Sequence, residues 1–111
     1  MNLQCQSHGS ADLITIPPQL VMANAPEARR AIKHLVKSGR IHLILDLKSV
    51  DFIDSSGLSV LVSTLKAVQE KNGEVVLLNP SDEVRSLIEL TRLHQVFDIF
   101  EDRDAAIEKL S

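Results

Sequence analysis

Two adjacent serines in the middle of the sequence are the residues best suited to chemistry. Ser55 and Ser56 follow Asp54 and precede Gly57, between an apolar stretch and a helical pattern. The apolar residues that come next recur at i, i+3, i+4 and i+7, a spacing typical of an amphipathic helix. They are Leu58, Leu61, Val62 and Leu65. The serines are therefore predicted to lie at a helix N-terminus, where free N–H groups and the helix dipole favour an anion.

The two serines have a structural interpretation and a functional one. Serine and aspartate are favoured before a helix for backbone reasons alone, so the segment is typical of a strand-to-helix turn with a capping serine. An accessible hydroxyl at that place is also a phosphate acceptor. Phosphorylation would add a charge of about −1.5 to −2 beside Asp54. An apolar or acidic partner surface would then be repelled without refolding of the domain.

The composition predicts one globular domain that spans residues 1–111. The 111 residues are 44% hydrophobic and 24% charged, which suits a single core. The net charge is −3 and the basic residues are scattered, so we expect no nucleic-acid partner. Aromatic residues make up only 3% of the chain, which leaves no stacking platform for bases or sugars.

The sequence has no signal for targeting, for a metal or for a cofactor. Its apolar runs fall well short of the roughly 20 residues that cross a bilayer, and no basic segment leads into an apolar one at its start. We therefore expect a soluble, cytoplasmic protein with no direct membrane insertion. Cys5 is alone and the histidines are dispersed, so we expect no internal disulfide, no metal site and no cofactor. The histidines are His8, His34, His42 and His94.

Strand and helix patterns alternate along the chain. The predicted strands cover residues 3–7, 13–16, 41–47, 74–78 and 96–100, with residues 19–24 as a loop. The predicted helices cover about 25–38, 56–71, a segment capped by Ser81, and 102–110, with a break at 91–95. This order, ββαβαβαβα, predicts a small α/β domain whose mainly parallel or mixed sheet packs against helices. Ser55 then follows the carboxyl end of a strand, where partners and ligands meet such sheets.

Five segments of the sequence carry a family resemblance. They are residues 45–47, 50–58, 73–75, 90–93 and 96–97, and Asp-Ser-Ser-Gly-Leu at 54–58 is the most specific part. Together they resemble the STAS-domain family, specifically bacterial anti-sigma factor antagonists, over nearly the whole chain from Leu13 onward. The resemblance implies a single STAS-like domain and a regulatory protein rather than an enzyme.

The resemblance implies a partner switch that is controlled by phosphorylation. In that family the unphosphorylated domain binds an anti-sigma factor that is also a serine kinase of the histidine-kinase-like ATPase type, and the sigma factor is freed. The kinase modifies the first serine of the motif, which is Ser55 here, with Ser56 as the second candidate. The phosphorylated protein releases its partner, and a PP2C-type serine phosphatase resets it.

The surface around the phosphorylation site is predicted to bind the partner. Its candidate residues come from the helix start and from the loop before the first helix. They are Val21, Met22, Asn24, Asp54, Ser56, Gly57, Leu58 and Ser59. The family usually has an acidic residue in that loop, whereas Val21 stands at its position and makes the surface more apolar. Met22 has two interpretations, a partner contact and an anchor that packs on the core. Arg29, Arg30 and Lys33 are predicted to form a solvated helix face rather than a docking patch.

The sequence leaves two other function classes open. A serine-dependent hydrolase would use Ser55 as its nucleophile, but the sequence has no Gly-x-Ser-x-Gly elbow and no assignable base. A phosphate-binding Gly-x-x-x-x-Gly-Lys loop is also missing, which argues against nucleotide hydrolysis. A non-switching STAS subunit that braces the ATPase of a lipid-transport ABC system would keep the fold, and the departure at Val21 is compatible with that role.

Overall fold

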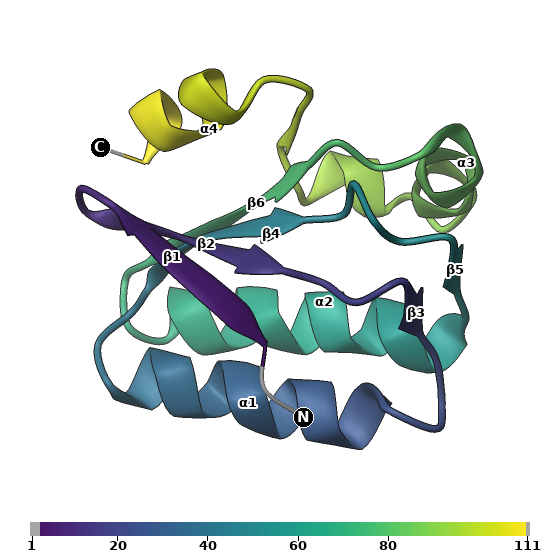
Figure 1. The fold of residues 1–111 in the computed structure, drawn as a ribbon, viewed down its shortest axis with the longest axis horizontal. Helices are drawn as coiled ribbons and strands as arrows, with labels where there is room; N and C mark the ends of the chain where they lie inside the picture. The colour runs from purple at the N-terminus through teal and green to yellow at the C-terminus, as the bar shows by residue number, and fades with distance from the viewer. Residues whose placement is uncertain (1–2, 111) are drawn as a thin grey trace.

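The computed structural model describes residues 3–110 and shows a twisted sheet with helices packed against it (Figure 1). The main sheet has the strand order β1-β2-β4-β6-β7. β1 (Gln4–His8) pairs antiparallel with β2 (Ala11–Thr15), which starts two residues before its predicted start. The other strands, β4 (His42–Asp46), β6 (Glu74–Leu78) and β7 (Ile99–Phe100), run parallel to β2. The predicted α/β class with a mainly parallel, mixed sheet is confirmed.

Helices cover both faces of this sheet. α1 (Ala25–Lys37) and α2 (Ser55–Gln69) lie side by side on one face, and α4 (Arg103–Lys109) lies on the other (Figure 1). α3 (Asp82–Leu90) packs at the end of the molecule where the N-terminus of α2 is found. This arrangement leaves the start of α2 at the carboxyl end of the parallel strands, as predicted.

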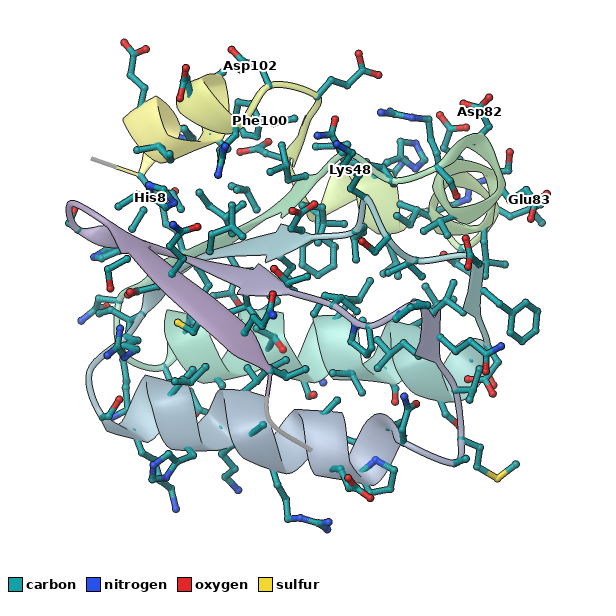
Figure 2. All side chains as sticks on the ribbon, in the orientation of Figure 1. His8, Lys48, Asp82, Glu83, Phe100 and Asp102 are labelled. Atoms are coloured by element: carbon teal, nitrogen blue, oxygen red, sulfur yellow. The ribbon has the colours of Figure 1, made fainter. Side chains whose placement is uncertain are left out.

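Alternate side chains of the central strand β4 enter two separate cores. Leu43 and Leu45 belong to the core that contains α1 and α2, whereas Ile44 between them belongs to the core under α4. All three are fully buried, which explains why this strand is a continuous apolar run in the sequence. Phe100 packs against the α4 core (Figure 2).

The sequence did not predict a second, two-stranded sheet. β3 (Gln19–Leu20) pairs in parallel with β5 (Phe52–Ile53), and Leu20 lies opposite Ile53. The prediction of a loop over residues 19–24 is therefore wrong at its first two residues. Strands of two residues have no periodicity that a sequence pattern could reveal, and their pairing joins segments that are distant in the chain.

The prediction of a strand over residues 96–100 is wrong in its first part. Leu93–Gln95 forms a 3-10 helix, η1, and only Ile99 and Phe100 belong to β7. Phe97 is 3% exposed and Val96 is 56% exposed, so a turn rather than a strand delivers the aromatic ring to the core. Apolar composition alone does not distinguish a short strand from such a turn.

Candidate functional site

A carboxylate, and not a serine, caps the helix that carries the motif. Asp54 precedes α2 with an extended backbone, and its Oδ1 accepts a hydrogen bond from the Gly57 N–H at 2.9 Å. The interpretation in which a serine caps this helix is therefore wrong. The helix begins at Ser55, one residue before its predicted start. Aspartate and serine are nearly equal caps, so the motif alone did not decide between them.

The same carboxylate also holds the loop before α1. Asp54 Oδ2 accepts a hydrogen bond from the Met22 N–H at 3.0 Å, so one side chain joins two distant segments. The hydrogen bond from the Gly57 N–H, followed by that from Met22, lowers the pKa of Asp54 below the usual 3.8, against the opposing effect of desolvation. Asp54 is therefore an anion at neutral pH, directly beside Ser55.

Ser55 presents its hydroxyl to solvent from the first residue of α2. The residue is exposed, and its hydroxyl has no hydrogen-bond partner among residues 3–110. Ser56 is half-buried. The predicted position of both serines at a helix N-terminus is confirmed. Of the two hydroxyls, that of Ser55 lies on the more accessible residue.

Gly57 allows α2 to approach the small β3–β5 sheet closely. A Cβ atom at this position would overlap the backbone carbonyl oxygen of Leu20 and would lie 2.6 Å from Cγ1 of Ile53. A backbone carbonyl in a sheet cannot move aside as a flexible side chain can. Only glycine fits here, and it fixes the start of α2 against the segment that leads into the loop between β3 and α1.

The predicted partner-binding residues fall into two groups by exposure. Gly57 is buried and Leu58 is only 8% exposed, so both support the site from inside instead of forming its surface. The remaining residues are exposed or half-buried. They are Val21, Met22, Asn24, Asp54, Ser56 and Ser59. Because Asp54 ties the Met22 backbone to the start of α2, the loop and the helix form one surface around Ser55.

The loop between β3 and α1 presents one large apolar side chain. Met22 is 73% exposed, which rules out the interpretation of this residue as a core anchor. Asn24 shapes the loop, because its Oδ1 accepts from the Val21 N–H and its Nδ2 donates to the Gln19 carbonyl, both at 2.8 Å. Asn24 therefore fixes the conformation of this loop, and Met22 is its exposed tip.

Ser59 is held by a residue of α1. Its hydroxyl donates to the Ser56 carbonyl at 2.7 Å and accepts from Nη2 of Arg29 at 2.9 Å. Arg29 is exposed, in agreement with the predicted solvated face, yet its guanidinium contacts α2. Residues three and four apart are neighbours on a helix, so this cation lies about one turn from Ser55.

Phe52 is a surface residue that the sequence prediction missed. It is 57% exposed in β5, whereas its neighbour Ile53 is buried. A hollow of about 190 Å³ beside it is lined by Asp51 and, from α3, by Glu83 and Leu87. Figure 2 shows Glu83 at the outer side of α3. The signal that could have found Phe52 is a large apolar residue out of phase with the buried positions of the same strand.

Within residues 3–110, no group of three or more His, Cys, Asp or Glu side chains is placed to hold a metal ion. Over that same range, no helix has the length and apolar character needed to span a bilayer.

Comparison with known protein families agrees with the fold and with the motif. The sequence model of the STAS domain matches residues 2–106, which is nearly the whole chain. The protein therefore belongs to the STAS domain family. The resemblance seen in the sequence is confirmed.

Curated relatives of this chain are named anti-sigma factor antagonists. An anti-sigma F factor antagonist of Paenibacillus polymyxa is 30% identical over 69 residues, 62% of this chain, and the match spans 59% of that relative's length. An anti-sigma-B factor antagonist of Staphylococcus aureus is 25% identical over 101 residues, which cover 91% of this chain and 94% of the relative.

Solved structures share the fold. A Thermotoga maritima protein described as a candidate anti-sigma factor antagonist has a TM-score of 0.91 at 24% identity, over 97% of this chain and 93% of its own. The phosphorylated form of SpoIIAA, a cell fate determinant of Bacillus, has a TM-score of 0.77 at 20% identity, over 98% of this chain and 99% of its own. At these identities the likeness demonstrates the fold alone.

Proposed function

We propose that this protein is an anti-sigma factor antagonist whose binding is switched by phosphorylation of Ser55. The observation that carries the proposal is the exposed Ser55 hydroxyl at the N-terminus of α2 in a STAS domain. The names of the two curated relatives support the antagonist role. The phosphorylated form of SpoIIAA, which has the same fold, supports the modification. The proposed place of action is the cytoplasm.

The proposed partner is an anti-sigma factor that is also a serine kinase of the histidine-kinase-like ATPase type. The Ser55 Oγ attacks the γ-phosphorus of ATP, the new O–P bond replaces the bond to the departing ADP, and the hydroxyl proton passes to a base of the kinase. A PP2C-type serine phosphatase transfers the phosphoryl group to water and restores the hydroxyl. In this cycle the protein is a substrate and a binding module, not an enzyme.

The phosphate would change the partner-binding surface more than it changes the protein itself. A phosphoserine carries a charge of about −1.5 to −2, which the free N–H groups at the start of α2 favour. The Asp54 carboxylate beside it is already negative, because hydrogen bonds lower its pKa. A partner surface that seats a neutral hydroxyl would have to desolvate the new charge, at a cost of several kcal/mol. At about 1.4 kcal/mol per factor of ten, this cost is sufficient to separate a micromolar complex.

Ser56 is the second candidate for modification. It is half-buried, and its backbone carbonyl accepts the hydrogen bond from Ser59. A kinase would need to move more of the surrounding surface to reach this hydroxyl than to reach Ser55. The exposure difference therefore favours Ser55.

The proposal is tested with two substitutions at Ser55. The partner is first recovered from native lysate on the immobilised Ser55→Ala variant and identified by mass spectrometry. Its affinity for wild type, Ser55→Ala, Ser55→Asp and enzymatically phosphorylated protein is then measured by calorimetry. We expect Ser55→Ala to bind as wild type does, and the charged forms to bind at least about tenfold more weakly. Ser10→Asp, which adds the same charge in the exposed β1–β2 turn, is the matched control.

Three results would contradict the proposal. Equal affinity of the Ser55→Ala variant and the phosphorylated protein would show that Ser55 is not a switch. Recovery of an ABC-type ATPase in place of an anti-sigma factor would support the bracing role. Turnover of ester substrates by wild type, lost in Ser55→Ala, would indicate a hydrolase.

A further inference from the structure

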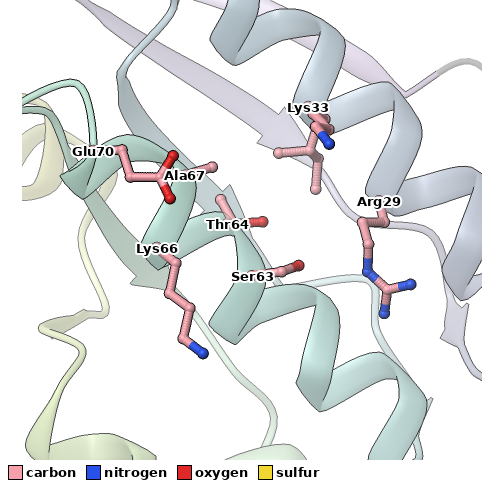
Figure 3. Close-up of a pocket in the computed structure, with 8 residues that line it drawn as sticks. Arg29, Lys33, Ser63, Thr64, Lys66, Ala67 and Glu70 are labelled. Atoms are coloured by element: carbon pink, nitrogen blue, oxygen red, sulfur yellow. The ribbon is translucent and has the colours of Figure 1, made fainter.

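A groove between α1 and α2 has three basic side chains in its lining, those of Arg29, Lys33 and Lys66. Figure 3 shows Arg29 and Lys33 extending from α1, with the hydroxyls of Ser63 and Thr64 pointing toward them from α2. We call this hollow of about 240 Å³ the helix groove. Lys66 also lines it, and Glu70 lies at the end opposite to Arg29 (Figure 3).

The two helices that form the groove carry a charge opposite to that of the whole chain. α1 and α2 together contain five lysine and arginine side chains and one acidic side chain, a net charge of +4 with histidine neutral. The chain as a whole has a net charge of −3, so the remainder carries −7. Arg29 and Lys33 are one helical turn apart, which places both cations on the same side of α1.

We propose that the helix groove binds an acidic segment of the partner protein whose binding Ser55 controls. The inference rests on the proposed function and extends it by naming the chemistry of the partner. Charge complementarity selects a carboxylate-bearing occupant, because three of the lining side chains are cationic and Glu70 is the one acidic residue among those that line the groove. The half-buried Ala67 supplies apolar surface for the methylene groups of a glutamate side chain, and the buried Ile32 forms the floor of the groove.

The hydroxyls in the groove are already engaged as donors. Ser63 Oγ donates to the Val60 carbonyl at 3.1 Å, and Thr64 Oγ1 donates to the same carbonyl at 2.8 Å. Because both hydroxyl hydrogens are used in these bonds, neither hydroxyl can donate to an anion in the groove. Attraction of a carboxylate therefore falls to the cations of the lining. Lys66 lies four residues before Glu70, which offsets its charge, so Arg29 and Lys33 are the decisive residues for a test.

The groove is continuous with the switch. Arg29 donates to the Ser59 hydroxyl at 2.9 Å, and Ser59 donates to the Ser56 carbonyl at 2.7 Å. A phosphate on Ser55 would lie about one helical turn from Ser59, at the Arg29 end of the groove. It would repel an acidic segment and compete for Arg29. One modification would thus weaken two contacts of the same partner.

The test compares two double variants that remove the same charge from the same helix. Arg29→Gln with Lys33→Gln changes the groove, whereas Arg30→Gln with Lys37→Gln changes exposed cations that do not line it. Affinity for the recovered anti-sigma factor is measured by calorimetry at several salt concentrations, with circular dichroism to confirm folding. We expect the groove variant to lose at least about tenfold in affinity and most of the salt dependence, and the control variant to lose less than about threefold.

Each outcome has a defined meaning. An equal loss in both double variants would overturn the inference, because only the net charge of α1 would then matter. Unchanged affinity in the groove variant, with Ser55→Asp still weak, would overturn the inference and leave the proposed function standing. Failure of both wild type and Ser55→Ala to bind an anti-sigma factor would overturn the proposed function itself. Self-association of wild type that the groove variant abolishes would identify a second copy as the occupant and overturn the inference.

Discussion

At the scale of single residues, the carboxylate of Asp54 serves two segments with its two oxygens. One oxygen caps α2 through the Gly57 N–H, and the other accepts from the Met22 N–H in the loop between β3 and α1. A serine in its place would offer one acceptor oxygen and could not reach both groups. Asp54 is therefore the residue that assembles the surface around Ser55.

Loss of this carboxylate should weaken the fold and loosen the loop between β3 and α1. We expect Asp54→Ala to lower the midpoint of thermal unfolding and to increase hydrogen exchange at the Met22 amide, because both hydrogen bonds disappear. The exposed neighbour Asp51 provides the control. The Asp51→Ala variant should keep the unfolding midpoint and the Met22 exchange rate of wild type. An unchanged exchange rate at Met22 in Asp54→Ala would contradict this role.

The pKa of Asp54 predicts a pH dependence with a defined sign. Hydrogen bonds lower this pKa in the folded protein below the usual 3.8. The resulting stabilisation is complete above the pKa of the unfolded chain and is lost as the pH falls through the pKa of the folded protein. In urea unfolding, wild type should therefore lose stability relative to Asp54→Asn as the pH is lowered from about 5 to below 3. A difference between the two proteins that stays constant with pH would contradict the assignment.

At the scale of elements, the contact between α2 and β3 depends on the absence of a side chain. Alanine is a better helix former than glycine by about 1 kcal/mol, so propensity alone predicts that Gly57→Ala stabilises α2. The added Cβ would overlap the Leu20 carbonyl, and overpacking of this kind costs about 1–3 kcal/mol or more. The steric effect is the larger one because the obstacle is backbone.

We therefore expect Gly57→Ala to reduce the free energy of unfolding by about 2 kcal/mol. Ser55→Ala, which places alanine on the same helix turn at an exposed position, should remain close to wild type. Chemical denaturation of both variants measures the difference. A higher stability for Gly57→Ala would show that α2 moves away from β3 without cost.

The long elements of the fold were predictable because each carries its own pattern. The helices show apolar stripes with breaks after them, and β4 and β6 are continuous apolar runs between turn residues. β3 and β5 were not predictable, because two residues form no pattern and each strand exists only through the other. Val96 and Phe97 were misassigned because an apolar pair fits a turn as well as a strand.

The candidate site was predictable in position but not in its internal contacts. The motif placed Ser55 at a helix start, and the structure confirms that placement. The bond between Asp54 and Met22 joins segments that no local pattern connects, and the burial of Leu58 depends on the packing of α2 on the sheet. Arg29 was predicted as a solvated residue because its contact with Ser59 crosses between two helices.

At the scale of the whole molecule, the sheet separates two cores with different tasks. One core lies under α1 and α2, which carry the candidate site, and the other lies under α4 on the opposite face. Damage to the α4 core should therefore reduce stability without changing the binding surface of the folded protein. The central strand β4 allows this to be tested, since Ile44 faces only the α4 core.

We expect Ile44→Ala to cost about 2–5 kcal/mol of stability, because a fully buried side chain leaves a cavity. At a temperature well below its unfolding midpoint, the variant is folded, and its affinity for the partner, measured by calorimetry, should equal that of wild type. Lys48→Ala, an exposed substitution shortly after the same strand, should change stability by less than about 0.5 kcal/mol. A partner affinity that falls together with stability would show that the two faces are coupled.

The hydrogen bond from the loop to Asp54 uses the main chain of Met22, not its side chain. Any amino acid except proline supplies that N–H, so the identity of residue 22 is free to diverge while its position stays fixed. Related domains within one cell could then carry different side chains at this position on a loop of unchanged conformation. Under the proposed function, the side chain at this one exposed position would let each domain bind a different partner, while Asp54 and Ser55 stay the same.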